Sequence, residues 1–325
     1  DKEENYLIGN AEIYNYRELI SDMTNVDLKS KSDCEPPLHL YTRYGLDFVN
    51  HLRGMYAFAI YDKQRARLVL ARDPFGIKPL YFVEDSEGFF FASEVQALLK
   101  AGCAERKLSK ALVSQLLNKQ FVAGPETIFR DIKRVAPGEI LVVEKGKIVE
   151  RHQNHALSNA PILVSSLSGL EQDLDRELSE SVEFHQRSDV PYGLFFSGGI
   201  DSTCILAEMV RRTDRPVITY TAGFDAGSVT DETKHARNIS ESVGASYSEI
   251  RITCDDFWNE LPNIAAALDD PCADYAIIPT YILARHAAKD VKVVLSGEGG
   301  DELFAGYGRY RRELRPRWLG GRRSS

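Results

Sequence analysis

A short run of small and hydroxyl-bearing residues, SGGIDST at 197–203, follows the apolar stretch YGLFF at 192–196. Gly198 and Gly199 have no Cβ, so the backbone can turn sharply there and approach a ligand closely. If a helix begins in this run, its first N–H groups lack acceptors within the helix, and its dipole favours an anion. Hydroxyl donors in the same run would help; they belong to Ser197, Ser202 and Thr203. The run therefore predicts a phosphate or pyrophosphate site, and the plainer alternative is a strand-to-helix turn capped by serine.

Asp201 is an unexpected companion for a phosphate, because like charges repel. A second apolar run, VKVVL at 291–295, is followed by the glycine-rich acidic sequence SGEGGDE at 296–302. Mg²⁺ takes oxygen ligands from carboxylates and phosphates together. If the two runs face each other, Asp201 and Asp301 would share Mg²⁺. The alternative for the second run is a solvated acidic turn.

The sequence around these runs alternates apolar strands with helical segments, which is typical of a parallel sheet covered on both faces. We expect strands at 192–196, 216–224, 247–252 and 291–295, and helices at 203–212, 231–243 and 255–268. Ligands of such sheets bind at the carboxyl ends of the strands. Both glycine-rich runs occupy that position.

The first half of the chain is rich in short strands separated by turn residues. Strands are expected at 5–10, 54–62, 67–73, 79–84 and 89–94, with helices at 16–23 and 35–46. Ser32 and Glu35 have the spacing of a capping box before the second helix. Many strands with few helices predict an α+β layered domain.

The composition of the 325 residues is that of a globular protein, with a net charge of −8. This charge argues against a general nucleic-acid binder. The five cysteines include no CxxC pair, which argues against a zinc site or a disulfide framework and for a reducing compartment. There is no membrane-spanning apolar stretch and no signal peptide, so we expect a cytoplasmic protein.

Two longer stretches, SDVPYGLFFSGGIDS at 188–202 and VVLSGEGGDELFAGYGRY at 293–310, resemble the synthetase domain of glutamine-hydrolysing asparagine synthetases. In that family SGGxDS is the pyrophosphate-binding loop of a PP-loop ATPase domain. The first half is similar to the family's Ntn-type class II glutamine amidotransferase domain. The matching segments are GNAEIYNYREL, SDCE, LRGMYAFAIYD, ARDPFGIKPLYF and FASEVQAL, at 9–19, 32–35, 52–62, 71–82 and 91–98.

The resemblance implies an α+β layered glutaminase domain at 1–150, a linker at 151–170, and an α/β doubly wound parallel-sheet domain at 171–325. It implies that ATP activates the side-chain carboxylate of aspartate, giving β-aspartyl-AMP and pyrophosphate, and that ammonia then displaces AMP. Glu298 matches the family's base for the incoming nitrogen, and Mg²⁺ would lie on Asp201 and Asp301. The nucleotide-binding positions would be Leu194, Ser197, Gly198, Gly199, Asp201, Ser202, Thr203, Gly223, Ser296 and Gly297.

In the glutaminase half, Asn10 and the N–H of Ala11 match the family's oxyanion hole. Asn10, Glu12 and Asp33 match positions that hold glutamine. The family has glycine where Ala11 stands, and alanine restricts φ. The family nucleophile is an N-terminal cysteine, whereas the sequence begins at Asp1 and its first cysteine is Cys34. It stops at Ser325, before the family's later helices and their catalytic lysine, so we expect a truncated member without glutaminase activity.

The implied partners are small molecules: ATP, aspartate, and glutamine or ammonia. We expect no nucleic acid and no membrane, and a homodimer is possible. Two alternatives stay open. One is a related adenylating enzyme, like β-lactam synthetase, acting on another carboxylate; residues 269–275 and 278–281 would decide between substrates. The other is a catalytically inactive remnant.

Overall fold

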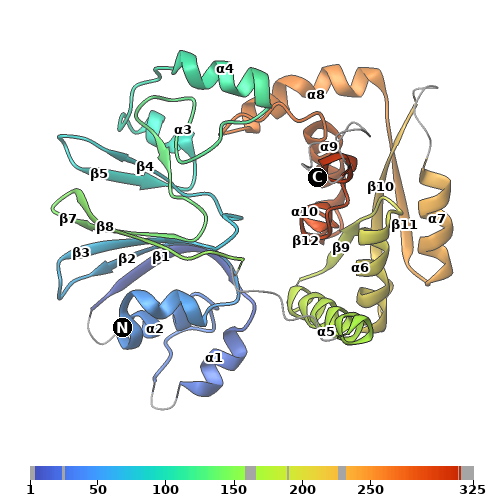
Figure 1. Ribbon diagram of the computed structural model, residues 1–325, viewed down its shortest axis with the longest axis horizontal. Helices are drawn as coiled ribbons and strands as arrows, with labels where there is room; N and C mark the ends of the chain where they lie inside the picture. The colour runs from blue at the N-terminus through green and yellow to red at the C-terminus, as the bar shows by residue number, and fades with distance from the viewer. Residues whose placement is uncertain are drawn as a thin grey trace. The chain divides into compact units, whose positions relative to one another are not determined.

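The computed structural model describes residues 4–23, 26–157, 166–188, 190–225, 232–313 and 315. The chain forms two compact units (Figure 1). The first contains residues 1–163 together with 265–275, and the second contains 164–264 and 276–325. Residues 158–165 of the expected linker, and the expected helix start at Asp231, lie outside the described residues.

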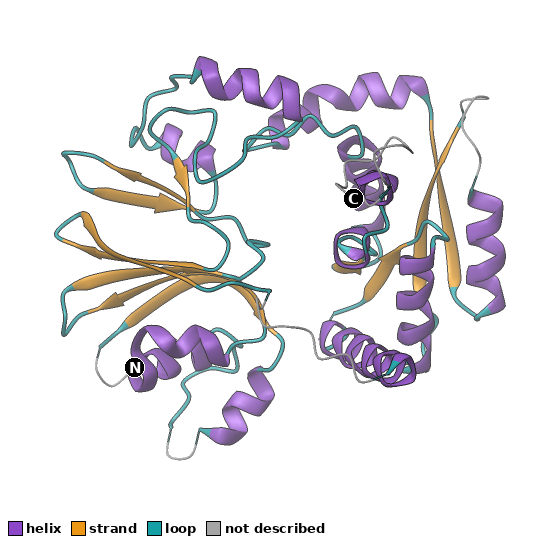
Figure 2. Cartoon of the chain, in the orientation of Figure 1, coloured by secondary structure: helices purple, strands orange, loops and turns teal. Residues whose placement is uncertain are grey.

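The first unit is built on two antiparallel sheets (Figure 2). The five-stranded sheet has the order β1-β2-β3-β7-β8, and the three-stranded sheet has the order β5-β4-β6. The five strands of the larger sheet are Tyr6–Ile13, Gly54–Asp62, Arg67–Arg72, Glu139–Glu144 and Lys147–Gln153. The strands β4, β5 and β6 are Tyr81–Glu84, Phe89–Ala92 and Lys133–Arg134.

The alternation along β2 explains the layers of this unit. Tyr56, Phe58 and Ile60 face a core shared with helices α1 (Tyr16–Asp22) and α2 (Glu35–Tyr44). Ala57 and Ala59 point to the opposite face, where they pack with residues of the smaller sheet. Successive side chains of a strand point to opposite faces, so one strand supplies both cores. A third core joins β4 to α3 (Val95–Lys100) and α4 (Lys110–Lys119).

The two helices predicted in this half are present, but two details differ. The second helix was expected to reach residue 46 and ends at Tyr44, because Gly45 has φ +59° and a 3₁₀ helix, Gly45–His51, follows. The predicted capping box is absent. Ser32 Oγ accepts from the N–H of Cys34, while the Glu35 carboxylate turns back to the N–H groups of Lys29 and Ser30, each at 2.7 Å.

The second unit is a parallel sheet, as predicted, and its strand order is β11-β10-β9-β12. Its strands are Tyr192–Phe195 (β9), Ile218–Phe224 (β10), Ser246–Ile252 (β11) and Val293–Leu295 (β12). One core joins the sheet to α5 (Leu167–His185), α6 (Ile200–Arg211) and α7 (Thr233–Ser242). A separate core joins it to α9 (Ile277–Ala287). The remaining helices are α8 (Cys254–Ala267), α10 (Gly300–Phe304) and α11 (Gly308–Glu313).

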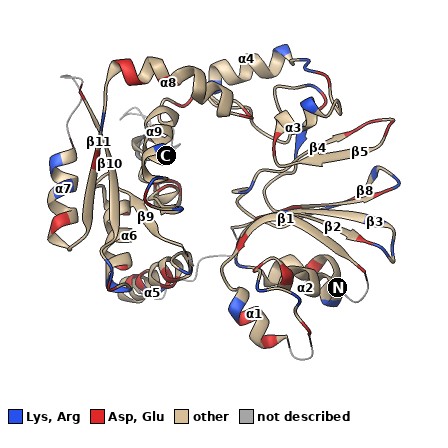
Figure 3. Ribbon diagram, turned by 180° about the vertical axis from the view of Figure 1, so that it is seen from behind, with Lys and Arg blue, Asp and Glu red and all other residues tan. Residues whose placement is uncertain are grey.

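Helix α5 was not predicted from the sequence. Leu170, Leu174, Leu178 and Val182 recur every four residues along it, and this helical spacing was the available signal. Lys and Arg are interspersed with Asp and Glu along both units, as Figure 3 shows. Among the described residues, none of the helices combines the length and apolar character needed to cross a membrane.

Candidate functional site

The strand order of the second unit places two loops at one point of the sheet. From β9 the chain moves outward to β10 and β11, then returns to pair β12 with the other side of β9. β9 and β12 are parallel, with Leu194 opposite Leu295, so their carboxyl ends lie side by side. Such a reversal of strand order is where open α/β sheets bind ligands. We call residues 196–203 the phosphate loop and residues 296–302 the acidic loop.

The phosphate loop is fixed at its base and open at its turn. The N–H of Phe196 donates to Tyr220 O at 2.9 Å, and Thr221 Oγ1 donates to Phe196 O at 2.7 Å. Gly198 then takes φ +77°, a conformation that favours glycine. Gly199 is the N-cap of α6 and has no side chain to fill the cap, so the first amides of the helix remain available.

The hydroxyl groups of Ser197, Ser202 and Thr203 lie at the same turn. Ser197 Oγ accepts from the N–H of Gly199 at 3.2 Å and lies 3.2 Å from Ser202 Oγ. Thr203 Oγ1 is buried and has no hydrogen-bond partner among the described residues. A buried hydroxyl without a partner is costly, and an oxyanion bound at the turn would relieve that cost.

The acidic loop packs directly onto the phosphate loop. A Cβ placed on Gly297 would lie 3.1 Å from the Ser202 nitrogen and 3.2 Å from Asp201 Cβ. A Cβ on Gly300 would lie 2.6 Å from Asp201 Cγ. The two loops are therefore in close contact, and the Asp201 carboxylate lies against the start of α10. The structure brings together Asp201, Ser202 and Gly297, three of the positions singled out in the sequence.

The structure shows no such close contact with the phosphate loop for the other two acidic candidates, Glu298 and Asp301. Glu298 is exposed, and its N–H lies 3.4 Å from Ser296 Oγ. Asp301 lies on α10 with its carboxylate against Gly306. Among the described residues, no three His, Cys, Asp or Glu side chains gather so as to hold a metal ion. A magnesium site on Asp201 and Asp301 would therefore need oxygen ligands from the substrate, which is the usual mode for Mg²⁺.

Leu194 and Gly223 are two further positions expected to bind the nucleotide. Leu194 is fully buried in the core between sheet and helices. A Cβ on Gly223 would lie 2.9 Å from Thr233 Cγ2 and 3.3 Å from the Arg251 side chain. Gly223 therefore leaves room for the start of α7, and its contact with a nucleotide stays a prediction.

In the first unit, the predicted glutamine-binding residues gather around β1. Asn10 and Glu12 are exposed and point to one face of the strand, while Ala11 packs against the opposite core. Asp33 Oδ2 accepts from the N–H of Ile13 at 2.7 Å, which places this carboxylate beside Glu12.

The negative charge of these carboxylates contributes to raised pKa values of two neighbouring groups, Cys34 and Tyr14. Burial, with the carboxylates of Asp33 and Glu12 nearby, raises the pKa of the Cys34 thiol to about 11. Burial, with Glu12 and Asp73 nearby, raises the pKa of Tyr14 to about 12. A cluster of carboxylates suits a cation, such as the ammonium group of an amino acid.

Sequence reasoning placed Asp73 only at the end of the expected strand 67–73 and missed that its carboxylate organises the loop that follows. Asp73 is fully buried and accepts hydrogen bonds from the N–H groups of Ile77 at 2.9 Å and Lys78 at 3.0 Å. The Arg72 guanidinium holds the same loop, donating to the carbonyls of Lys78, Gly76 and Val135. The signal available in the sequence was a charged pair, Arg72 and Asp73, at the end of an apolar strand.

Comparison with known proteins finds a matching family for each half of the chain. A glutamine amidotransferase domain family matches residues 1–154, and the asparagine synthase family matches residues 173–324. A Bacillus subtilis protein named asparagine synthetase [glutamine-hydrolyzing] 1 is 36% identical over 312 residues, covering 95% of this chain and 49% of its own length. The chain thus carries a glutamine amidotransferase domain followed by an asparagine synthase domain.

The chain also resembles proteins with other names. A Penicillium rubens protein named amidase chyE is 28% identical, covering 95% of this chain and 48% of its own length. A glutamine phosphoribosylpyrophosphate amidotransferase from B. subtilis superposes on 75% of this chain and 45% of its own, with a TM-score of 0.36 and 16% identity. The chain thus spans about half the length of the curated relatives described here.

Proposed function

We propose that the second unit activates a carboxylate with ATP, forming an acyl-adenylate and pyrophosphate, as part of glutamine-dependent asparagine synthesis. The contact between the phosphate loop and the acidic loop at the switch point of the sheet carries this proposal. The match of residues 173–324 to the asparagine synthase family supports it.

The residues of the phosphate loop suit the leaving group of this reaction. As the bond between the α- and β-phosphates breaks, negative charge grows on the pyrophosphate. The free amides at the start of α6 and the hydroxyls of Ser197, Ser202 and Thr203 would stabilise that charge without reorganising. Asp201 and Asp301 would hold Mg²⁺, which neutralises phosphate charge when bound. Glu298, exposed beside the loop, would accept a proton from the attacking ammonia.

In the first unit, the carboxylates of Glu12 and Asp33 would bind the α-ammonium group of glutamine. Asn10 and the N–H of Ala11 would form the oxyanion hole for its amide. We propose that ATP, aspartate, and glutamine or ammonia are the small-molecule substrates of the whole protein.

The test is ATP- and aspartate-dependent release of pyrophosphate by the purified chain, with ATP·Mg²⁺ affinity measured separately. Asp201→Ala and Asp301→Ala should abolish release. The matched control is Asp214→Asn, an exposed acid on the turn after α6, which should leave it unchanged. Unchanged release by Asp201→Ala would contradict the metal assignment, and absence of ATP binding would contradict the function itself.

A second carboxylate substrate is the alternative, and the similarity to the Penicillium rubens amidase favours testing it. Pyrophosphate release that needs ATP but responds to another carboxylate rather than aspartate would establish that alternative.

A further inference from the structure

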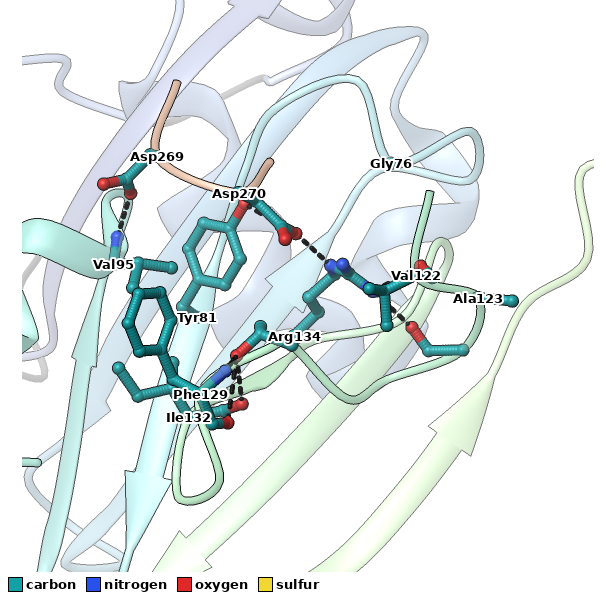
Figure 4. A network of polar contacts seen from close by, with 12 residues as sticks. Gly76, Tyr81, Val95, Val122, Ala123, Phe129, Ile132, Arg134, Asp269 and Asp270 are labelled. Atoms are coloured by element: carbon teal, nitrogen blue, oxygen red, sulfur yellow. Dashed lines mark hydrogen bonds and ion pairs between the residues drawn. The ribbon is translucent and has the colours of Figure 1, made fainter. Parts of the chain in front are cut away.

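Residues 265–275 belong to the first unit, although in sequence they lie among residues of the second. They cover the end of α8 and the connection to α9, which begins at Ile277. The sequence assigned part of this segment to a substrate pocket. In the structure, its two consecutive acids, Asp269 and Asp270, turn onto first-unit residues instead (Figure 4).

Asp269 caps helix α3. Its carboxylate accepts from the N–H groups of Val95 and Gln96, the latter at 2.8 Å. The N-cap residue of α3, Glu94, makes no capping bond with its own side chain. Asp269 therefore supplies the acceptor that the helix start lacks, and it places a negative charge at the positive end of the helix dipole.

Asp270 forms an ion pair with Arg134 of β6. Both side chains are only 15% exposed. Arg134 is itself held in place, since Nη1 donates to Val122 O at 3.0 Å and Gly124 O at 2.8 Å. The hydroxyl of Tyr81 lies 3.5 Å from the same carboxylate oxygen. Removing one charge of such a buried pair leaves the other uncompensated, which strongly disfavours the docked arrangement.

A backbone hydrogen bond adds a third anchor. The N–H of Ala273 donates to Gln120 O, just after α4, at 2.7 Å. The segment is thus fixed at three points: the start of α3, strand β6 and the end of α4.

The anchored segment leads directly into α9. This helix packs through Leu283 and Ala287 against Tyr220 of β10, and the chain then enters β12. A helix that leads into a parallel strand runs antiparallel to the strands of the sheet. It therefore begins near the carboxyl ends of those strands. Residues 278–281, expected to contact the carboxylate substrate, lie in the first turns of α9.

We propose that Arg134 and the start of α3 are positioning groups for the carboxylate substrate of the synthase reaction. They act through Asp270 and Asp269, which hold the peptide from which α9 starts. The proposal rests on the proposed function, because it assumes that the carboxylate binds beside α9. ATP is held by the phosphate loop and does not depend on this anchor.

The anchor is tested by hydrogen exchange on the full 325-residue chain. In Arg134→Gln and Asp270→Asn, amides of residues 268–276 should exchange about tenfold faster, as expected for loss of a hydrogen bond to a charged group. Arg134→Lys keeps the charge and should restore part of the protection. Arg151→Gln is the matched control, because it breaks the Arg151–Glu139 pair, 2.6 Å between Nη1 and Oε1, in the same unit. Unchanged exchange in both test variants would overturn the proposal.

The positioning role is tested by pyrophosphate release with aspartate and ATP varied in turn. Arg134→Gln should raise the KM for aspartate about tenfold, the same loss of one charged hydrogen bond, and leave the KM for ATP unchanged. Arg134→Lys should recover part of it. An unchanged KM for aspartate, or an equal rise in Arg151→Gln, would overturn the proposal. A chain that binds no ATP contradicts the proposed function instead, and hydrogen exchange then still decides the anchor.

Discussion

Glu35 is the residue whose charge is most clearly favoured by the fold. Burial opposes its ionisation, but the Ser30 hydroxyl, the N–H groups of Lys29 and Ser30, and His39 together lower its pKa to about 2 from 4.5. The carboxylate gathers the chain before α2 instead of capping the helix. At the residue scale, this makes Glu35 a source of stability that depends on pH.

Because the folded pKa of Glu35 lies below the unfolded one, its stabilisation is complete above pH 4.5 and is lost as the pH falls toward 2. Glu35→Gln should lower the free energy of unfolding by about 1–3 kcal/mol at pH 7, as expected for bonds to a charged group. The difference should shrink at pH 3. Urea unfolding at both pH values measures it, and an equal difference at both would show that the charge does not matter.

The pKa of Tyr81 provides a separate measure of the charge on Asp270. Burial, with the Asp270 carboxylate next in importance, raises the pKa of Tyr81 to about 12. Asp270→Asn should lower that pKa, because the phenolate no longer meets a like charge, and burial should keep it above 10. Titration of ring-labelled tyrosine by NMR, with Tyr81→Phe to assign the signal, provides the measurement. No change would mean that the two side chains are apart in solution.

At the scale of the element, the turn between β9 and α6 depends on Gly198. A Cβ there would lie 3.2 Å from Ala236 Cα and 3.3 Å from the His235 ring, and φ is +77°. Gly244 has nearly the same φ, +76°, with nothing within 4 Å of its Cβ position. The two glycines therefore share a conformational cost and differ in surroundings.

Gly198→Ala and Gly244→Ala should each lower stability by about 1–2 kcal/mol, the cost of a left-handed non-glycine residue. Only Gly198→Ala should weaken ATP binding, because only there must the phosphate loop shift. Calorimetric titration with ATP·Mg²⁺ and thermal unfolding of both variants provide the comparison. Equal ATP affinity in the two would show that the turn does not hold the nucleotide.

Local chemistry explains which parts of the site could be predicted from the sequence. The turn at Gly198 and the strand ends beside Asp201 follow from glycine conformations and from the strand-helix alternation. The capping of α3 by Asp269 could not be predicted, since donor and acceptor are 174 residues apart. Asp301 faces Gly306 because of a short helix that no periodicity reveals.

At the scale of the whole molecule, the two units have separate cores, so each should unfold cooperatively by itself. Trp258, on α8, falls in the second unit. ATP·Mg²⁺ at 100 times its Kd should stabilise that unit by about 2.7 kcal/mol. The unfolding transition followed by tryptophan fluorescence should then move to higher temperature. The transition that the first unit contributes to the far-UV circular dichroism should keep its midpoint temperature. A shift of both together would show that the units unfold as one.

The cap that Asp269 places on α3 also sets an order for events during synthesis of the chain. Val95 leaves the ribosome 174 residues before the acid that caps its helix. At about 5–20 residues per second, the delay is on the order of ten to thirty seconds. During that time α3 starts without its acceptor, and Arg134, once made, waits for another 136 residues before Asp270 follows. The amino-terminal unit is therefore completed late, after most of the following sheet has been translated.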